Sequence, residues 1–240
     1  MKSIIIAAGK GSRIPEFTKD IPKSLIKINN KSLLKRQIDQ MRNFNIKKIA
    51  IVKGYKSNKI NFKNIKYFHN KNYNNNEQLD SFIVANKWFS DDLLVSFSDI
   101  IYENSILEKM IKSKYDFTIA VQKNWKKKYN DRFDHPVSQA DKVFIKKNKI
   151  LNIGKKISEN KANGEFLGIF KLSKNMCKNF IIEYKKLNKK KKTNKLQLHN
   201  FFQYLINKNF NIKPTFVNGK FMEIDTFNDF TIARKIFYEK

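Results

Sequence analysis

The chain has 240 residues, and 41% of them are hydrophobic, which is enough for one α/β domain with a sizeable core. Its 50 Lys and Arg residues against 21 Asp and Glu residues give a formal net charge of +29, a balance typical of proteins that bind nucleic acid or acidic membranes. Nearly all of these basic residues are lysines scattered among Asn, Ile and Phe. Lysine lacks the paired donors that base and phosphate recognition favour, so we expect the partner not to be nucleic acid.

Cysteine content and hydropathy exclude two further classes of protein. The single cysteine, Cys177, cannot form an internal disulfide, and no spacing of Cys and His is typical of a zinc site. The apolar run after Met1 is too short for a signal peptide or a membrane span, and no later run is long enough either. We therefore expect a cytoplasmic protein that does not enter the membrane.

Strand and helix patterns alternate along the first half of the chain. Short runs rich in β-branched residues predict buried strands, and apolar residues at spacings of three and four predict amphipathic helices. This alternation is typical of βαβ units around a mixed, mostly parallel sheet, so we expect a Rossmann-like α/β fold. The expected strands are Ser3–Ala8, Lys48–Lys53, Asn64–Phe68 and Leu93–Phe97, and the expected helices are Ser32–Phe44 and Leu79–Phe89.

The second half has fewer helices between its expected strands, which indicates a sheet extension or a small substrate-binding lobe, roughly residues 122–172, within a single domain spanning residues 1–240. Thr226 and Asp229 form the pattern of a capping box, which predicts the start of the last helix. The tract Lys185–Lys195 is nearly all Lys and Asn, so we expect an exposed loop or a frayed helix end. The other expected strands are Phe117–Val121, Val143–Lys147, Phe166–Leu172 and Phe221–Asp225, and the other expected helices are Asn179–Leu187 and Leu196–Lys208.

A glycine-containing loop, Ala7-Ala8-Gly9-Lys10-Gly11-Ser12-Arg13, follows the first expected strand. Its glycines let the backbone turn tightly and present amide N–H groups to an anion, and Lys10 and Arg13 add positive charge. Ile14 and Pro15 exclude a Walker loop and a dinucleotide fingerprint, which need a Gly-Lys-Ser/Thr sequence and an immediate helix respectively. Further on, Pro22 holds Lys23 on a rigid turn. Together these two motifs predict a site for the phosphates of a nucleotide.

The two motifs resemble the sugar-nucleotidyltransferase-like family, whose signature is an A-A-G-x-G-[ST]-R loop followed by a P-K-[SCA]-L/M segment. The resemblance is to the branch that uses CTP on small phosphorylated compounds, namely the phosphocholine, 2-aminoethylphosphonate and phosphoglutamine types of cytidylyltransferase. It implies that Ala7, Ala8, Gly9, Lys10, Gly11, Ser12, Arg13, Lys23 and Ser81 bind CTP, with Arg13 and Lys23 acting in catalysis. It covers most of the chain through the segments 52–55, 131–143, 152–155, 164–166 and 222–226.

The resemblance also implies where the acceptor binds. Arg132, Lys155 and Glu165 lie in the segments that resemble the acceptor lobe. The phosphocholine and phosphonate enzymes carry an Asn-Asn-x-x-Ser-like segment, which reads Asn75–Ser81 here and contains additional acidic residues such as Asp80. We therefore expect an acceptor with a phosphate, bound by Arg132 and Lys155, and an ammonium group, bound by Asp80 or Glu165.

Three carboxylates are expected to hold a metal ion. Asp99 comes just after the strand Leu93–Phe97, and open α/β sheets bind their ligands at such strand ends. Glu223 and Asp225 are two residues apart in an expected strand, so both side chains should project to one face. Carboxylates that meet a triphosphate are the usual ligands of Mg²⁺, and we expect Asp99, Glu223 and Asp225 to bind it.

The predicted reaction is the transfer of CMP from CTP to a small phosphorylated acceptor with release of pyrophosphate, for surface-glycan or phosphonate-type biosynthesis. Lys10 and Arg13 would hold the leaving pyrophosphate, and Lys23 would stabilise the charge that develops on the α-phosphate. Two alternatives stay open. One is a sugar 1-phosphate acceptor with UTP or dTTP as the donor, and the other is a basic nucleic-acid-binding protein on an inactive nucleotidyltransferase scaffold.

Overall fold

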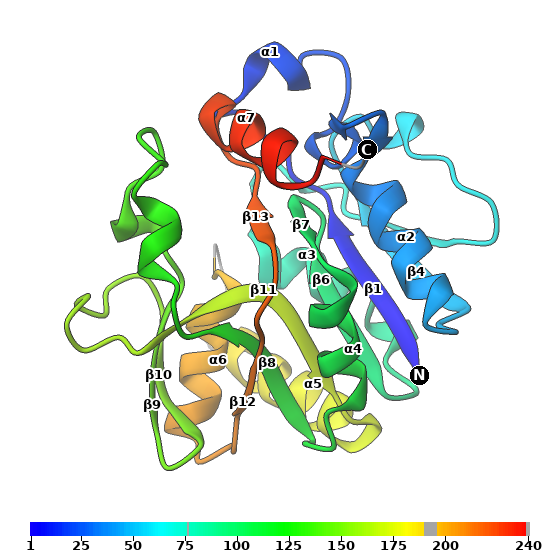
Figure 1. The fold of residues 1–240 in the computed structure, drawn as a ribbon. Coiled ribbons are helices and arrows are strands. Elements are labelled where there is room, and N and C mark those ends of the chain that lie inside the picture. Colours follow the sequence, from blue (N-terminus) through cyan, green and yellow to red (C-terminus); the bar gives the residue numbers. More distant parts are fainter. Residues whose placement is uncertain (76, 190–195, 239–240) are drawn as a thin grey trace.

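A mixed sheet forms the centre of the computed structural model, which describes residues 1–75, 77–189 and 196–238 (Figure 1). Its strands within these ranges are β1 (Lys2–Ala7), β4 (Lys48–Lys53), β5 (Lys66–His69), β6 (Leu93–Phe97), β8 (Phe117–Gln122), β9 (Lys142–Lys146), β10 (Lys149–Ile153), β11 (Gly164–Leu172) and β12 (Lys213–Phe216). The order β6-β1-β4-β5 is parallel, and β11 joins β6 in the antiparallel sense. β11 also pairs with β9 and β8, which lead to β10 and β12. The prediction of a Rossmann-like fold with a mixed sheet is confirmed.

Helices cover both faces of this sheet. They are α2 (Leu33–Asn43), α3 (Gln78–Val84), α4 (Asn104–Lys112), α5 (Lys174–Lys189) and α6 (Leu198–Asn207). α2 and α4 lie on one face, and α3, α5 and α6 lie on the other (Figure 1). Because both faces are covered, the inner strands are apolar along their whole length; every residue of β6 is buried, for example.

The C-terminal segment crosses the carboxyl ends of the parallel strands. There β13 (Phe221–Glu223) pairs antiparallel with β7 (Ile100–Tyr102), and α7 (Phe227–Ile236) packs beside α1 (Pro15–Thr18) and the short strands β2 (Lys27–Ile28) and β3 (Lys31–Ser32). The capping box is confirmed, because the Asp229 N–H donates to Thr226 Oγ1 over 3.1 Å and the Thr226 N–H donates to Asp229 Oδ2 over 3.0 Å. This packing brings the last acidic residues of the chain to the end of β6.

Several boundaries differ from the predictions. The strand expected over Phe221–Asp225 ends at Glu223, because the next residues lead into the N-cap of α7. The helix expected over Leu79–Phe89 ends at Val84, and α5 begins before the expected Asn179. Of the tract Lys185–Lys195, the first residues belong to α5, and residues 190–195 lie outside the described residues. The elements α1, β2, β3, α4, β7, β10 and β12 were not predicted, and all of them except α4 are five residues or shorter.

Candidate active site

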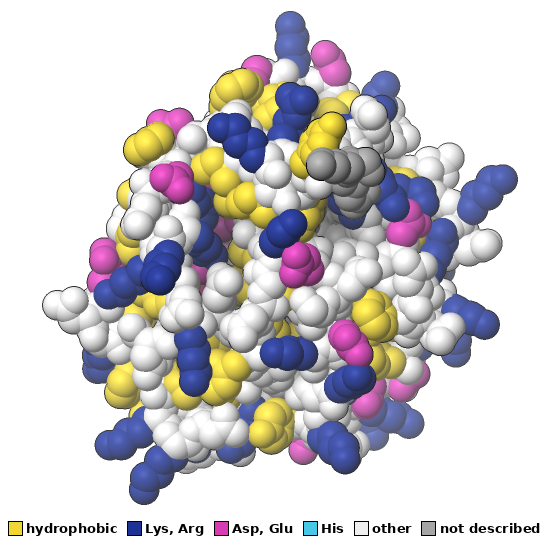
Figure 2. All heavy atoms as spheres, in the orientation of Figure 1, with side chains coloured by type: hydrophobic (Ala, Val, Ile, Leu, Met, Phe, Trp, Pro, Cys, Tyr) yellow, Lys and Arg dark blue, Asp and Glu magenta, His cyan; other side chains and the backbone are white. Residues whose placement is uncertain are grey.

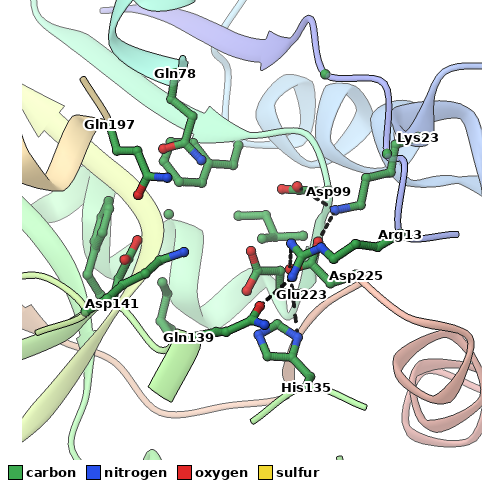
Figure 3. Close-up of a pocket in the computed structure, with 18 of the residues that line it drawn as sticks. Arg13, Lys23, Gln78, Asp99, His135, Gln139, Asp141, Gln197, Glu223 and Asp225 are labelled. Carbon is green, nitrogen blue, oxygen red and sulfur yellow. Dashed lines mark hydrogen bonds and ion pairs between the residues drawn. The ribbon is translucent and has the colours of Figure 1, made fainter. Parts of the chain in front are cut away.

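A cavity opens at the carboxyl ends of β1 and β6 (Figure 3). The phosphate loop, Asp99 in the turn after β6, the segment before β9, and β13 all contribute to its wall, as is typical of open α/β sheets. The residues that line the cavity thus come from the N-terminal, central and C-terminal parts of the chain. Its charged and amide-bearing lining residues are Arg13, Lys23, Glu77, Gln78, Asp99, His135, Gln139, Asp141, Lys155, Glu165, Gln197, Glu223 and Asp225.

The phosphate loop is held in one shape by its own glycines and by Thr18. Gly11 has a φ of +73°, and a Cβ at this position would lie 2.9 Å from Cβ of Lys23. Only glycine therefore allows the loop to pass so close to Lys23. The Thr18 hydroxyl donates to the Gly11 carbonyl over 2.9 Å. Gly9, Gly11, Ser12 and Arg13 line the cavity.

The other predicted loop residues lie around this cavity. Ala7 is the buried last residue of β1, and Ala8 borders a second cavity directly beside the first. Ser81, on α3, lines that second cavity and accepts a hydrogen bond of 2.9 Å from Asn70 Nδ2. The exposed Lys10 has its Nζ 5.8 Å from the centre of the Tyr55 ring and does not line either cavity.

Lys23 lies between two of the predicted metal-binding carboxylates. Its Nζ donates to Oδ2 of Asp99 over 2.8 Å and also to Oδ1 of Asp225. Burial alone would lower the pKa of Lys23, but the carboxylates of Asp99 and Asp225 raise it above its usual value. The side chain is therefore a fixed, fully charged ammonium.

Asp225 receives a second cation. Nη2 of Arg13 lies 2.5 Å from Oδ2 of Asp225, and Nη1 of the same residue donates to Oε1 of Gln139 over 2.5 Å. Burial would raise the pKa of Asp225, but Lys23 and Arg13 lower it below its usual value. Both cations that were predicted to act on the phosphates of CTP thus contact the same carboxylate (Figure 3).

Glu223 has the opposite electrostatic environment. Its burial, together with the negative charges of Asp225 and Asp99, raises the pKa of this carboxyl well above its usual value. One ligand atom from each of Glu223, Asp225 and His135 lies within 4.8 Å of the others. The carboxylates of Glu223 and Asp225 therefore meet, as expected from their spacing of two residues, although the strand itself ends at Glu223.

This crowding of carboxylates fits a divalent cation. A group whose ionised form is disfavoured by neighbouring negative charges is stabilised when a cation binds among them. Carboxylate oxygens are also the ligands that Mg²⁺ prefers in proteins. Asp99, Glu223 and Asp225 all line the cavity. The ligand atoms that lie within 4.8 Å of one another belong to Glu223, Asp225 and His135, and Asp99 is linked to Asp225 through Lys23.

Arg132 lies behind these carboxylates, outside the cavity lining. Its side chain is 1% exposed, with Nε donating to Oδ1 of Asp229 over 2.6 Å and Nη2 donating to the Glu223 carbonyl over 3.1 Å. His135 Nδ1 lies 2.6 Å from Nη2 of Arg132 and 3.2 Å from Oδ2 of Asp229. The Arg132 guanidinium thus stabilises the segment that carries Glu223 and Asp225, and it does not reach the cavity where a ligand would bind.

The other predicted acceptor residues divide into two groups. Lys155 and Glu165 line the cavity, and Glu165 is already contacted by Lys128 and by the Tyr129 hydroxyl. Asp80 does not line the cavity; its carboxylate is near the N-terminus of α3, where it accepts from the Glu77 N–H over 3.4 Å. The extra acidic group at this position thus caps a helix.

Six charged or amide-bearing residues of the cavity were not assigned from the sequence, and Glu77 and His135 are two of them. Gln139 and Asp141 lie in the segment 131–143, whose resemblance to the phosphonate enzymes was the available signal. Gln78 lies in the segment that departs from the related enzymes. Gln197 follows the lysine-rich tract and had no signal. Figure 3 shows Asp141 and Gln197 on the side of the cavity opposite Lys23 and Arg13, so the cavity has a cationic end and a distal end.

The fold is that of the nucleotidyltransferases. CTP:phosphocholine cytidylyltransferase from Streptococcus pneumoniae has a structure that matches with a TM-score of 0.80 over 99% of both chains, at 19% sequence identity. Residues 3–156 match the family of MobA-like NTP transferase domains, and the chain belongs to this family.

Two of the relatives that are similar in sequence are cytidylyltransferases. CTP:phosphoglutamine cytidylyltransferase of Campylobacter jejuni is 29% identical over 97% of this chain and 98% of its own length. Choline-phosphate cytidylyltransferase of Haemophilus influenzae is 33% identical over 50% of this chain and 52% of its own length. The resemblance expected from the loop and Pro-Lys motifs is confirmed.

The distribution of basic side chains and the length and polarity of the helices relate to two partners considered from the sequence, nucleic acid and membranes. On the face drawn in Figure 2, Lys and Arg side chains are spread over the molecule and alternate with acidic and apolar ones, and they do not form one continuous patch. In the described ranges, every helix is either too short or too polar to cross a membrane.

Proposed function

We propose that this protein is a cytidylyltransferase that transfers CMP from CTP to a small acceptor bearing both a phosphate or phosphonate and an amino group. Its role would be in surface-glycan or phosphonate-type biosynthesis. The observation that supports it best is the placement of Arg13 and Lys23 on the acidic cluster at the end of β6. The near full-length similarity to a CTP:phosphoglutamine cytidylyltransferase supports the choice of CTP and of an amino-bearing acceptor.

In this reaction an oxygen of the acceptor phosphate attacks the α-phosphorus of CTP, and the bond from that phosphorus to the oxygen bridging to the β-phosphate breaks. Pyrophosphate leaves, and no protein nucleophile or proton transfer is needed. Lys23 stabilises the charge that develops on the α-phosphate, and Arg13 holds the leaving pyrophosphate. Lys10, which is exposed and lies outside both cavity linings, takes no part in this proposal. The chain thus contributes positions and fixed charges, which are the main source of rate enhancement in phosphoryl-group transfer.

Asp99, Glu223 and Asp225 are the residues that would hold Mg²⁺. When bound there, the ion supplies positive charge to the phosphate oxygens of CTP. The two cations on Asp225 would then leave this carboxylate and become available to the phosphates. The neighbouring cavity bordered by Ala8 and Ser81 is the place we assign to the cytidine.

Pyrophosphate release with each of CTP, UTP, dTTP, ATP and GTP, combined with a panel of acceptors, tests this proposal. We expect turnover with CTP and with phosphoglutamine, 2-aminoethylphosphonate or phosphocholine. Equal rates with UTP or dTTP and glucose 1-phosphate would instead support a sugar-phosphate nucleotidyltransferase. Failure of every pair, together with tight binding of an unrelated RNA or DNA duplex, would support the nucleic-acid alternative.

A further inference from the structure

We propose that Asp141, oriented by His199, is the residue that recognises the ammonium group of the acceptor. This inference rests on the proposed function and replaces the expectation that Asp80 or Glu165 has this role. Asp80, Glu165 and Asp141 differ in their contacts, and Glu77, which also lines the cavity, belongs to the capping box at the start of α3.

Asp80 and Glu165 are both committed elsewhere. Asp80 is outside the cavity lining and accepts from the N–H of Glu77 at the start of α3. Glu165 borders the cavity, but Lys128 forms an ion pair with it and the Tyr129 hydroxyl donates to it. An acceptor ammonium would have to compete with a lysine that is already in contact and largely buried, at 14% exposure.

Asp141 has no cationic Lys or Arg partner among the described residues, and its side chain stays 18% exposed at the cavity. Nδ1 of His199 lies 2.9 Å from its Oδ1, and this oxygen is buried, so it is not the atom that a ligand in the cavity would reach. The other carboxylate oxygen, Oδ2, has no donor among the described residues and keeps its capacity to accept from a ligand. An ammonium donor offers the charge-assisted hydrogen bonds that such a group favours.

Two contacts fix the position of Asp141, one to its backbone and one, from His199, to its carboxylate. Its carbonyl accepts from the Phe166 N–H of β11 over 2.8 Å, which holds the backbone at the start of β9. The His199 ring, on α6, is packed against the backbone of Gly154, where a Cβ would lie 3.3 Å from Cδ2 of the ring. Gly154 has a φ of +138°, a conformation that other residues rarely adopt. His199 is therefore a positioning residue, held by the turn that also presents Lys155.

Charges of both signs meet at this distal end of the cavity. Lys155, the residue after Gly154, lines the same cavity as Asp141, and the amide of Gln197 lies nearby (Figure 3). An acceptor that combines an ammonium with an anionic group matches a carboxylate and a lysine there. A hexose 1-phosphate presents hydroxyl groups to the same residues and would leave the Asp141 charge unpaired.

The test compares Asp141→Asn with the wild type on a matched pair of acceptors. The amino-bearing member is whichever of phosphoglutamine or 2-aminoethylphosphonate the wild type uses better, since both carry N–H donors, and the other member is its analogue without the amino group, such as ethylphosphonate. We expect the acceptor KM to rise at least tenfold for the amino-bearing compound only, because one charge-assisted hydrogen bond is lost, while the KM for CTP stays the same. Asp134→Asn, at an exposed acid of the same segment outside the cavity, is the matched control and should change neither constant.

His199→Asn provides a second variant that does not remove the carboxylate. We expect a smaller rise in the same KM, and no further rise when this change is added to Asp141→Asn, since His199 acts only through Asp141. Equal changes for both acceptors of the pair, or an unchanged KM in a folded Asp141→Asn protein, would overturn the inference while leaving the cytidylyltransferase proposal intact. Absence of turnover by the wild type with CTP and every amino-bearing acceptor would overturn both.

Discussion

Nζ of Lys23 lies 2.8 Å from Oδ2 of Asp99, although the two residues are 76 positions apart in the sequence. The same ammonium contacts Asp225, so a single lysine joins the phosphate-loop region, the end of β6 and the C-terminal segment. This lysine neutralises two of the carboxylates that would hold Mg²⁺. Its proposed role on the α-phosphate requires that the metal takes over that neutralisation.

Replacement of Lys23 by Ala should lower kcat by roughly a hundredfold to a thousandfold, the usual cost of losing one donor that stabilises transition-state charge. The KM for CTP should change little, since the lysine acts on charge that grows during the reaction. Steady-state pyrophosphate release at varied CTP measures both constants. A raised KM with an unchanged kcat would make Lys23 a ground-state binding residue only.

Replacement of Asp99 or Asp225 by Asn should reduce turnover by about a thousandfold or more, because each variant weakens the cation site among the carboxylates. Removal of divalent ions with a chelator should abolish the activity of the wild type, and added Mg²⁺ should restore it. Asp20→Asn is the control, since that side chain is 85% exposed and distant from the cavity lining. Near-normal turnover by Asp99→Asn would show that this carboxylate only anchors Lys23.

Arg13→Gln should raise the KM for CTP by roughly tenfold, because a charged donor to the leaving phosphates is lost. The melting temperature should stay close to that of the wild type, since the Arg13 side chain is 50% exposed. Arg42→Gln, a change at another exposed arginine that contacts only a backbone carbonyl over 2.6 Å, serves as the comparison. A large loss of stability in Arg13→Gln would contradict a role confined to the nucleotide.

Asp229→Ala should lower the free energy of unfolding by about 3–5 kcal/mol, because it leaves the buried guanidinium of Arg132 without its partner. The variant should also show a weaker affinity for Mn²⁺ in a calorimetric titration, since Arg132 then loses its hold on the Glu223 backbone. Urea denaturation gives the first value, with Asp20→Ala expected to stay within about 0.5 kcal/mol of the wild type. A folded variant with normal metal affinity would limit Asp229 to a structural role.

The same carboxylate predicts how stability depends on pH. Burial would raise the pKa of Asp229, but hydrogen bonds from His135 and Arg132 lower it below its usual value of 3.8. The unfolded chain therefore binds this proton more readily, so the stabilisation is fully present above pH 3.8 and is lost as the pH falls toward the folded-state pKa. Denaturation measured between about pH 6 and pH 3 should show a steeper loss for the wild type than for Asp229→Asn, and parallel curves would contradict this assignment.

The strands β1, β4 and β6 and the phosphate loop could be predicted from the sequence alone, because each has a local sequence pattern. A buried parallel strand reads as a continuous apolar run, and a tight anion-binding turn needs its glycines at fixed positions. The three carboxylates could be predicted on the same local ground, from their places at strand ends. Family resemblance added the nucleotide and the lobe, and the match of residues 3–156 to MobA-like NTP transferase domains agrees with it.

Which side chains remain available to a ligand became clear from the tertiary structure. Arg132, Glu165 and Asp80 all have the charge that an acceptor needs, and packing commits each of them to an internal partner. Asp141 gives no such local signal, and its proposed role depends on His199, which lies 58 positions later in the sequence. Buried charges are usually paired within the fold, and contacts between distant segments determine which groups pair. The sequence pattern therefore shows which charges are present, and the packing determines which of them can bind a ligand.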